Sequence, residues 1–212
     1  DLTADVLSSR LELEPESGEV MVELRNDDGR YAPGSANVPG IGCQIDFSPG
    51  CVTPAGNETS SGITFSLEAL EHISAGGKST VLLHTADGWR AVRQWKGRHQ
   101  FRWNSSSSDT CVKDIIAFVL ARAGLKLEVI SQSAAATAFY PDFSINPGDS
   151  GMEVVGKLLS FVPDVLYIEG HKAFLVNPQA GDTSIYSYSS TTLTTDGHEH
   201  PILEGTYRDG AR

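Results

Sequence analysis

The chain has 212 residues and a formal net charge of −11, with 40% hydrophobic and 20% charged residues. Such a composition is that of a globular protein with a sizeable core. The negative charge argues against a general nucleic-acid binder, because phosphates attract the opposite sign. No apolar run approaches the roughly 18 residues needed for a membrane-spanning segment. No signal peptide is visible and the chain opens at Asp1, so we expect a processed piece or a fragment.

The first half of the chain predicts short antiparallel strands, as in a sandwich or small barrel. Apolar and acidic residues alternate over residues 11–14 and 20–24, which predicts a hairpin with a turn at Glu16–Gly18. Further strands are predicted at residues 41–47, 63–72 and 79–85. Gly76 and Gly77 suit a hairpin turn between the last two.

Residues 88–103, here called the basic aromatic segment, interrupt this acidic background. They hold five of the 16 Lys and Arg residues, no acid and all three tryptophans. Such a segment could stack bases and neutralise phosphates, anchor a protein interface, or pack a corner of the β-domain. We favour the interface. The candidate contact residues are Trp89, Arg90, Arg93, Trp95, Arg98, Arg102 and Trp103.

A polar linker at residues 105–108 predicts a domain boundary. After it, Asp109 is positioned to cap a helix that Gly124 ends. The buried face of this helix is predicted to consist of Val112, Ile115, Ile116, Val119 and Leu120. A strand is predicted at residues 125–130 and a loop of small residues at 131–138.

Residues 143–178 give the clearest local signals. Ser150 and Glu153 form a predicted capping box, and Pro163 should stop the helix. Its apolar face is predicted to comprise Val155, Leu158, Leu159 and Val162. A hairpin should follow over residues 165–176, turning at Gly170-His171, and bury Leu158 and Leu159 beneath it.

These elements predict an α+β fold that is mainly antiparallel β, barrel-like or sandwich-like, with an α/β insert of two helices and a hairpin. The predicted domains are a β-barrel-like domain at 1–104, the insert at 105–180, and the start of a truncated second β-domain at 181–212.

Metal and thiol chemistry have weak support. Cys43 and Cys51 could bridge a hairpin, but with Cys111 the cysteine number is odd, which favours reduced thiols. The acidic loop at residues 26–31 lacks the ligand spacing of a calcium loop. His198 and His200 alternate and could share a metal, yet a solvated turn is the simpler interpretation. We predict no bound metal and no cofactor.

The order of several motifs resembles the tail hub proteins of bacteriophages, of the late-control-protein D type, which are related to type VI secretion spike hubs. The matching stretches are LRNDDGRY (24–31), ADGW (86–89), the helix at 110–123, FSINPGDSGMEVVGKLLSFV (143–162) and HPIL (200–203). The resemblance covers most of the chain by the order of its elements.

This resemblance implies a structural protein without catalysis, located in the virion and assembled in the bacterial cytoplasm. It implies a homotrimeric ring between the tail tube and the baseplate or spike. The implied partners are copies of itself, a tail tube or distal tail protein, a spike or fibre protein, and DNA only in transit. The basic aromatic segment would then face a neighbouring subunit, whose residues 1–30 carry nine acids and three bases. The sequence departs from the family by ending at Arg212, where a second barrel should begin.

Two other classes of function have weaker support in the sequence. A hydrolase would need a nucleophile with a base, or paired carboxylates, and neither a GxSxG nor an HExxH motif occurs. A carbohydrate-binding β-module would need exposed aromatic side chains on a sheet face. Trp89, Trp95 and Trp103 could serve that role.

Overall fold

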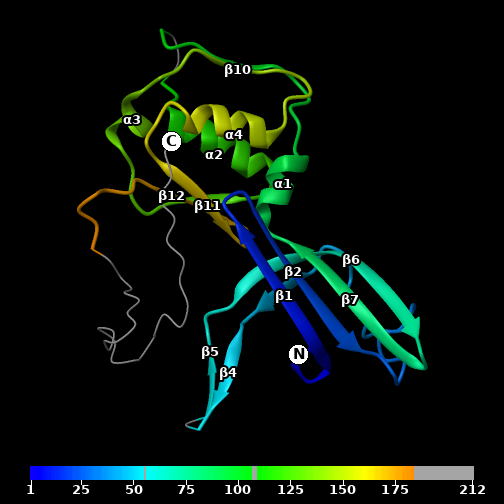
Figure 1. The fold of residues 1–212 in the computed structure, drawn as a ribbon. Coiled ribbons are helices and arrows are strands. Elements are labelled where there is room, and N and C mark those ends of the chain that lie inside the picture. The colour runs from blue at the N-terminus through cyan, green and yellow to red at the C-terminus, as the bar shows by residue number, and fades with distance from the viewer. Residues whose placement is uncertain (55, 107–108, 184–212) are drawn as a thin grey trace, which may run out of the picture. The chain divides into compact units, whose positions relative to one another are not determined.

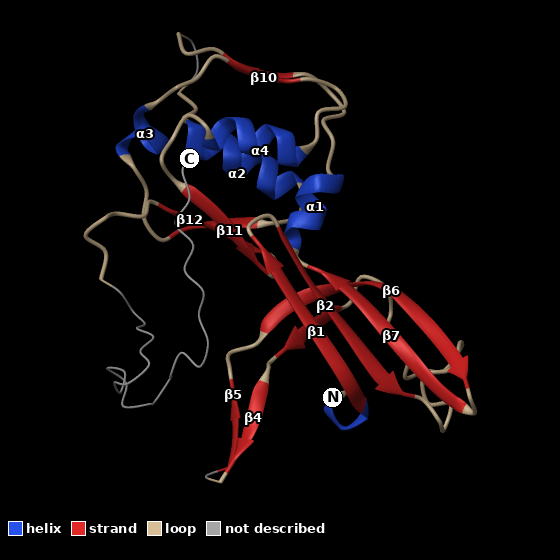
Figure 2. Ribbon diagram, in the orientation of Figure 1, coloured by secondary structure: helices blue, strands red, loops and turns tan. Residues whose placement is uncertain are grey.

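The computed structural model describes residues 1–54, 56–106 and 109–183 (Figure 1). It confirms the α+β class, with mostly antiparallel sheets (Figure 2). The strands are β1 (Val6–Glu14), β2 (Ser17–Arg25), β3 (Gln44–Phe47), β4 (Gly50–Thr53), β5 (Gly56–Thr59), β6 (Ile63–Ala75), β7 (Lys78–Ala86), β8 (Phe101–Trp103), β9 (Lys126–Val129), β10 (Phe143–Ile145), β11 (Val165–Glu169) and β12 (Lys172–Val176). The described α-helices are α1 (Gly88–Gln94), α2 (Val112–Arg122), α3 (Ala134–Ala138) and α4 (Gly151–Leu159), preceded by a 3-10 turn at Thr3–Asp5.

The N-terminal half forms a five-stranded antiparallel sheet in the order β1-β2-β7-β6-β3. The predicted first hairpin is confirmed, but its loop is shorter than predicted and consists of Pro15 and Glu16. Gly76 and Gly77 form the predicted turn with φ of 58° and 78°, as a two-residue hairpin loop requires. The small hairpin β4–β5 was not predicted.

One face of this sheet carries the first hydrophobic core. The alternation read from the sequence holds in β2, where Val20, Val22 and Leu24 are buried. The core is completed by Tyr31, Phe65, Leu67, Val81 and Leu83. Strand alternation therefore accounts for nearly all of it.

The helices enclose a second hydrophobic core. All five residues predicted for the buried face of α2 are 0% exposed. Gly124 ends the helix with φ 87°, and Leu125 donates back to the Leu120 carbonyl at 2.9 Å. The predicted start was wrong: the N-cap is Cys111 rather than Asp109, and its side chain makes no capping hydrogen bond.

Helix α4 has the predicted capping box between Ser150 and Glu153. Leu158 is fully buried, whereas Leu159 is only partly buried, because Val154 and Val155 take the more central positions. The helix ends at Leu159 rather than at Pro163, so Val162 lies in the turn that follows. Its main packing partners are α2 and α1, and the 165–176 hairpin shares the same core.

The 165–176 hairpin is confirmed as β11 and β12, turning at Gly170 with φ 60°. Strand β9 pairs in parallel with β12, giving a three-stranded sheet in the order β11-β12-β9 that was not predicted. The loop expected at 131–138 contains the short helix α3. Its N-cap Ser133 accepts from the Ala136 amide and donates to buried Asp164.

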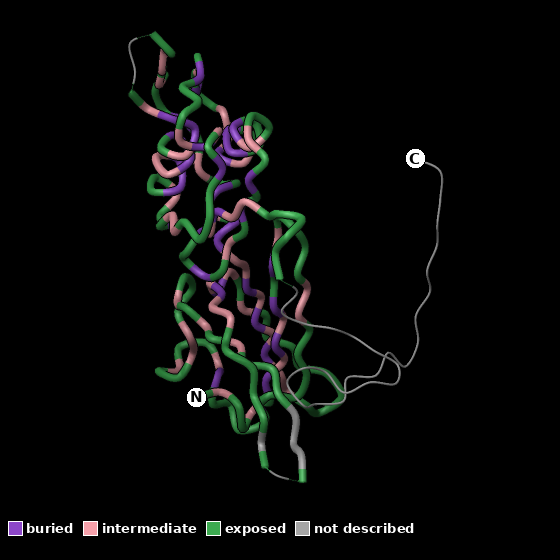
Figure 3. Tube along the Cα trace, turned by 90° about the vertical axis from the view of Figure 1, so that its left-hand side faces the viewer, coloured by how far each residue is buried: buried purple, intermediate pink, exposed green. Residues whose placement is uncertain are grey.

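The two cores are separate in sequence. Buried residues run through both the helical part and the sheet part of the chain (Figure 3). The first ends at Leu83 and the second begins at Trp89, so the basic aromatic segment packs with the helices. Residues Asp1–Asn177 form one compact unit. The division at residue 104 stays a prediction, and nearly all of the third predicted domain lies outside the described residues.

Candidate partner-binding surface

The basic aromatic segment begins as a helix directly after β7. The Asp87 side chain caps α1 by accepting from the Trp89 amide at 3.0 Å, and the Asp87 amide donates to the Gly18 carbonyl at 2.9 Å. Gly88 is required here, because a Cβ would lie 2.7 Å from the Gly170 carbonyl oxygen. The sequence favoured a turn at this point, and the structure shows a turn that continues into a helix.

The three tryptophans pack within the chain. Trp89 is 4% exposed and belongs to the second core. Trp95 and Trp103 are partly buried against the same core, and the Trp103 ring meets Phe118 edge-on at 5.4 Å between centroids. Trp89 and Val92 are three residues apart, a spacing that places both on one face of a helix. Two residues within a single turn are too few to predict a buried face from the sequence.

Two of the predicted interface cations make contacts inside the chain. Arg90 Nε lies 2.7 Å from Glu68 Oε2, and Arg93 Nη2 donates to the Glu16 carbonyl at 3.2 Å. Glu68 occupies a β-bulge in β6, where the register shifts between Leu67 and Ala69. Because bulges redirect side chains, this one accounts for the meeting of Glu68 with α1. Of these two arginines, only Arg93 reaches the N-terminal hairpin, and it does so through a backbone carbonyl.

Asp87 lies where β7, α1 and the tip of the β1–β2 hairpin meet. Burial raises the pKa of Asp87 to about 6, although hydrogen bonds from the Trp89 and Arg90 amides act in the opposite direction. Gly18 leaves room for this carboxyl, since a Cβ there would be 2.8 Å from Asp87 Oδ2. The junction therefore contains a carboxyl that titrates in an unusual range.

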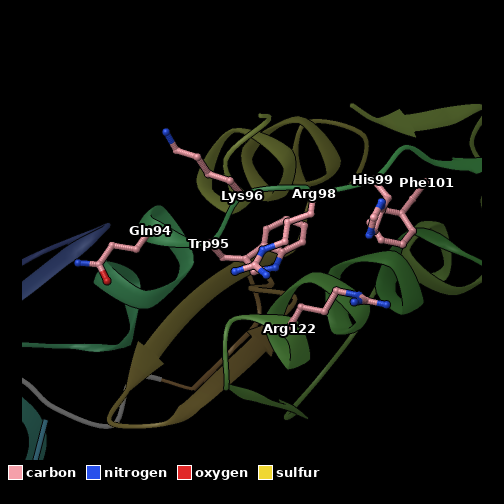
Figure 4. A pocket seen from close by; sticks show the side chains of 7 residues that line it. All are labelled: Gln94, Trp95, Lys96, Arg98, His99, Phe101 and Arg122. Atoms are coloured by element: carbon pink, nitrogen blue, oxygen red, sulfur yellow. The ribbon is translucent and has the colours of Figure 1, made fainter. Parts of the chain in front are cut away.

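The remaining part of the segment surrounds an open pocket of about 640 Å³. Figure 4 shows that Arg122 of α2 faces the residues that follow α1. The pocket is lined by Gln94, Trp95, Lys96, Arg98, His99, Phe101 and Arg122. Of the predicted interface residues, only Trp95 and Arg98 belong to this group. Arg102 is exposed on β8 and donates to the Asn104 side chain at 3.1 Å.

Arg122 was missed by sequence reasoning, because it lies about 20 residues beyond the segment on another element. Its guanidinium carbon is 4.9 Å from the Phe101 ring centroid and 4.3 Å from that of Phe118. These cation–π contacts hold the guanidinium beside the pocket. Only the exposed position in the last turn of α2 could have pointed to it.

The backbone between α1 and β8 is fixed against the start of α4. Gly151 donates to the Trp95 carbonyl at 2.9 Å, and Gly97 donates to the Asp149 carbonyl at 2.9 Å. Gly148 returns a bond to the Gly97 carbonyl at 2.8 Å, and β8 then pairs with β10. The side chains of Lys96 and Arg98 therefore project from an anchored strand-like stretch.

The acidic 26–31 loop is used structurally. Buried Asn26 accepts from the Tyr31 amide at 2.7 Å, and Asp27 accepts from the Ser79 amide at 3.2 Å. The Tyr31 hydroxyl donates to Asp5 at 2.5 Å; burial, followed by this hydrogen bond, raises the pKa of Tyr31. The LRNDDGRY stretch thus anchors the N-terminus and the β6–β7 turn.

No group of three or more potential metal-ligating side chains occurs within residues 1–54, 56–106 and 109–183. His198 and His200 lie outside the described residues. Cys43 and Cys111 are free thiols, and burial raises the pKa of Cys111. No helix in the described part is long and apolar enough to cross a membrane.

Comparison with known proteins gives structural similarity alone. No protein family model matches the chain, and no curated protein is similar in sequence. The fold is similar to the tail protein from Neisseria meningitidis MC58, with a TM-score of 0.54 and 12% identity over 85% of this chain and 47% of that one. It is also similar to the 43 kDa tail protein of prophage MuSo2 from Shewanella oneidensis, with a TM-score of 0.50 and 13% identity over 85% of this chain and 52% of that one.

The chain therefore has an α+β fold that it shares with parts of two tail proteins. It spans about half the length of each.

Proposed function

We propose that this chain is a structural component of a phage tail or phage-like particle. The observation that carries the proposal is the similarity of fold to two tail proteins over 85% of the chain. The motif order in the sequence, which resembles that of tail hub proteins, supports the same assignment. In finer detail, three copies form a hub ring that joins the tail tube to the baseplate or spike.

In this proposal the protein is located in the virion and has no catalytic activity. Its partners are copies of itself, a tail tube or distal tail protein, and a spike or fibre protein, and DNA passes only in transit. Ser133 donates to Asp164, as a nucleophile would to a base, but both residues are buried and Ser133 caps α3. Their burial supports a role in folding.

The alternative, a carbohydrate-binding β-module, needs exposed aromatic side chains on a sheet face, and the three tryptophans do not provide them. Trp89 is in the core, and Trp95 and Trp103 pack their rings against it. We expect no binding of the chain on a glycan array. Saturable binding to one glycan class would favour the carbohydrate-binding module instead.

The test of the hub role uses the full-length parent protein. Wild type should assemble as trimers or rings in sedimentation velocity and negative-stain electron microscopy. The Arg93→Glu, Arg98→Glu variant should assemble poorly, because it reverses two charges of the predicted interface. Normal rings that only eject DNA slowly would overturn the interface prediction, and a monomeric wild type would overturn the trimeric hub.

A matched control separates the two arginines. Arg93→Glu alone disturbs the contact with Glu16 inside the chain, whereas the Arg98 side chain forms no ion pair or hydrogen bond within the described ranges. Poor assembly with normal thermal stability in Arg98→Glu identifies a contact between molecules. A loss of stability in Arg93→Glu alone identifies an internal role for that arginine.

A further inference from the structure

We infer that the pocket between α1, β8 and α2 is a receptor for a carboxylate-rich segment of a partner protein. That this partner is a tail protein rests on the proposed function, whereas the chemistry of the pocket does not.

Six of the 14 Lys and Arg residues within the described ranges form an ion pair with an Asp or Glu, namely Arg10, Arg30, Arg90, Lys113, Lys126 and Lys172. Lys96, Arg98 and Arg122 form none within the described ranges, and all three line the same pocket. Of the described side chains that line it, none is acidic. The Arg98 and Arg122 guanidinium groups therefore line the pocket without an acidic partner in its wall, whereas the Lys96 ammonium extends away from them (Figure 4).

The pocket also offers directional donors. Arg98 and Arg122 present guanidinium groups, whose planar forks match a carboxylate with two parallel hydrogen bonds. Gln94 adds an amide, and Trp95 and Phe101 provide apolar walls. The ends of α1 and α2 each contribute roughly half a negative charge, which the two full charges of the guanidinium groups exceed. The net preference is for an anion.

The arrangement of the cations favours a protein segment over DNA. A nucleic-acid track would need cations at intervals along a groove. Here the basic aromatic segment is divided by the fold: Arg90 and Arg93 contact the β-sheet part of the chain, while Lys96 and Arg98 are among the residues that line the pocket. A compact cluster of cations with apolar walls suits a few acidic side chains rather than an extended phosphate backbone.

The pocket is prepared before any partner binds. The Trp95 and Gly97 backbones are bonded to Gly151 and Asp149, and the Arg122 guanidinium is held over Phe101 and Phe118. Preorganised groups lose less conformational freedom on binding than mobile surface side chains do. Anchoring of both walls therefore favours a specific site over diffuse attraction.

The test titrates the complete 212-residue chain with a hexaglutamate peptide and follows tryptophan fluorescence, in which Trp95 reports from the pocket wall. We expect saturable binding that weakens as NaCl rises from about 50 to about 300 mM, because the Debye length shortens. Lys96→Gln with Arg98→Gln should weaken binding by about tenfold or more, since charge-assisted bonds are lost. Neither residue has an internal ion pair, so folding should be retained, as checked by circular dichroism.

A matched control removes the same charge elsewhere. Arg25→Gln with Lys78→Gln alters two exposed cations of the five-stranded sheet, and binding should be unchanged. Equal weakening by both pairs would show diffuse electrostatics and overturn the inference. Lys96→Glu with Arg98→Glu should abolish peptide binding.

Two further probes complete the design. A short single-stranded oligothymidylate that binds more tightly than the peptide would make this a nucleic-acid site and overturn the inference. Full displacement of the peptide by millimolar inorganic phosphate would reduce it to a site for small anions and also overturn it. A full-length protein that assembles normally while failing to bind the peptide would refute this inference and leave the hub role standing.

Discussion

Arg90 of α1 and Glu68 of β6 form an ion pair, with Nε and Oε2 2.7 Å apart, and this pair joins the helical part of the chain to the five-stranded sheet. The Arg90 and Glu68 side chains remain 50% and 31% exposed. Exposed pairs contribute little, so we expect a coupling free energy of about 0.2–1 kcal/mol. A double-mutant cycle with Glu68→Gln and Arg90→Gln in urea unfolding measures it.

The control cycle pairs Glu68→Gln with Arg98→Gln, whose side chain lines the pocket instead. It should give additive changes in the free energy of unfolding. Coupling of the same size in both cycles would show that the measured term is not the ion pair.

Asp87 should make stability fall as the pH rises. Burial raises its pKa from the ordinary value of 3.8 to about 6 in the folded state. A raised folded-state pKa stabilises the fold fully below the unfolded value, and this contribution is lost as the pH rises through the folded value. Asp87→Asn keeps a good helix cap and does not titrate.

The stability of wild type relative to Asp87→Asn should therefore decrease between about pH 4 and pH 6 and level off above about pH 7. Urea unfolding of both proteins across this range measures the difference, in which the other carboxyl groups cancel. A difference that rises with pH would mean that hydrogen bonding, rather than burial, controls this carboxyl.

Leu158 and Leu159 should differ in their effect on stability. Leu158→Ala opens a cavity in the second core and should cost about 2–5 kcal/mol. Leu159 is only partly buried, so Leu159→Ala should cost about 1–2 kcal/mol. Chemical unfolding of both variants decides it, and equal costs would contradict the packing of α4.

The capping box should be detectable in the titration of the Glu153 carboxyl group. The pKa of Glu153 is lowered by the hydrogen bonds that link it to the Ser150 amide and hydroxyl. Ser150→Ala removes the hydroxyl and should move the Glu153 pKa back toward its usual value, as followed by NMR. The cap itself should be worth about 0.5–2 kcal/mol. An unchanged Glu153 pKa would show that the amide alone holds the carboxylate.

The prediction for His198 and His200 concerns residues outside the described structure. We expect no tight zinc binding in titration calorimetry of the chain. A strong signal that disappears in His200→Ala would reverse this prediction and reopen a metal-dependent function.

Prediction from sequence succeeded where the signal was local. The β1–β2 and β11–β12 hairpins, the buried face of α2 and the capping box of α4 each depend on residues within one or two turns or strands. Helix α1 was missed because it has only seven residues, and only the spacing of Trp89 and Val92 marks its buried face. Trp89 is buried in the second core, whose other members come from distant parts of the chain, so its burial could not be predicted from the local sequence.

The remaining misses are contacts between distant parts of the chain. The parallel pairing of β9 with β12 places Lys126 opposite Lys172. No local turn signal in the sequence predicts this pairing. The same holds for Arg122 at the pocket, which the packing of α2 places beside Phe101. Such contacts follow from packing, and single-sequence periodicity does not encode their partners.

The separation of the two cores along the chain has a consequence for synthesis on the ribosome. The first core uses residues up to Leu83, whereas the second cannot close until Leu175 has been made. At roughly 5–20 residues per second, the interval of about 90 residues lasts roughly 5–20 s. The N-terminal sheet can therefore form during translation, while α2 and its apolar face wait for β12. A chaperone therefore has the most apolar surface to protect while the helical half of the chain is being made.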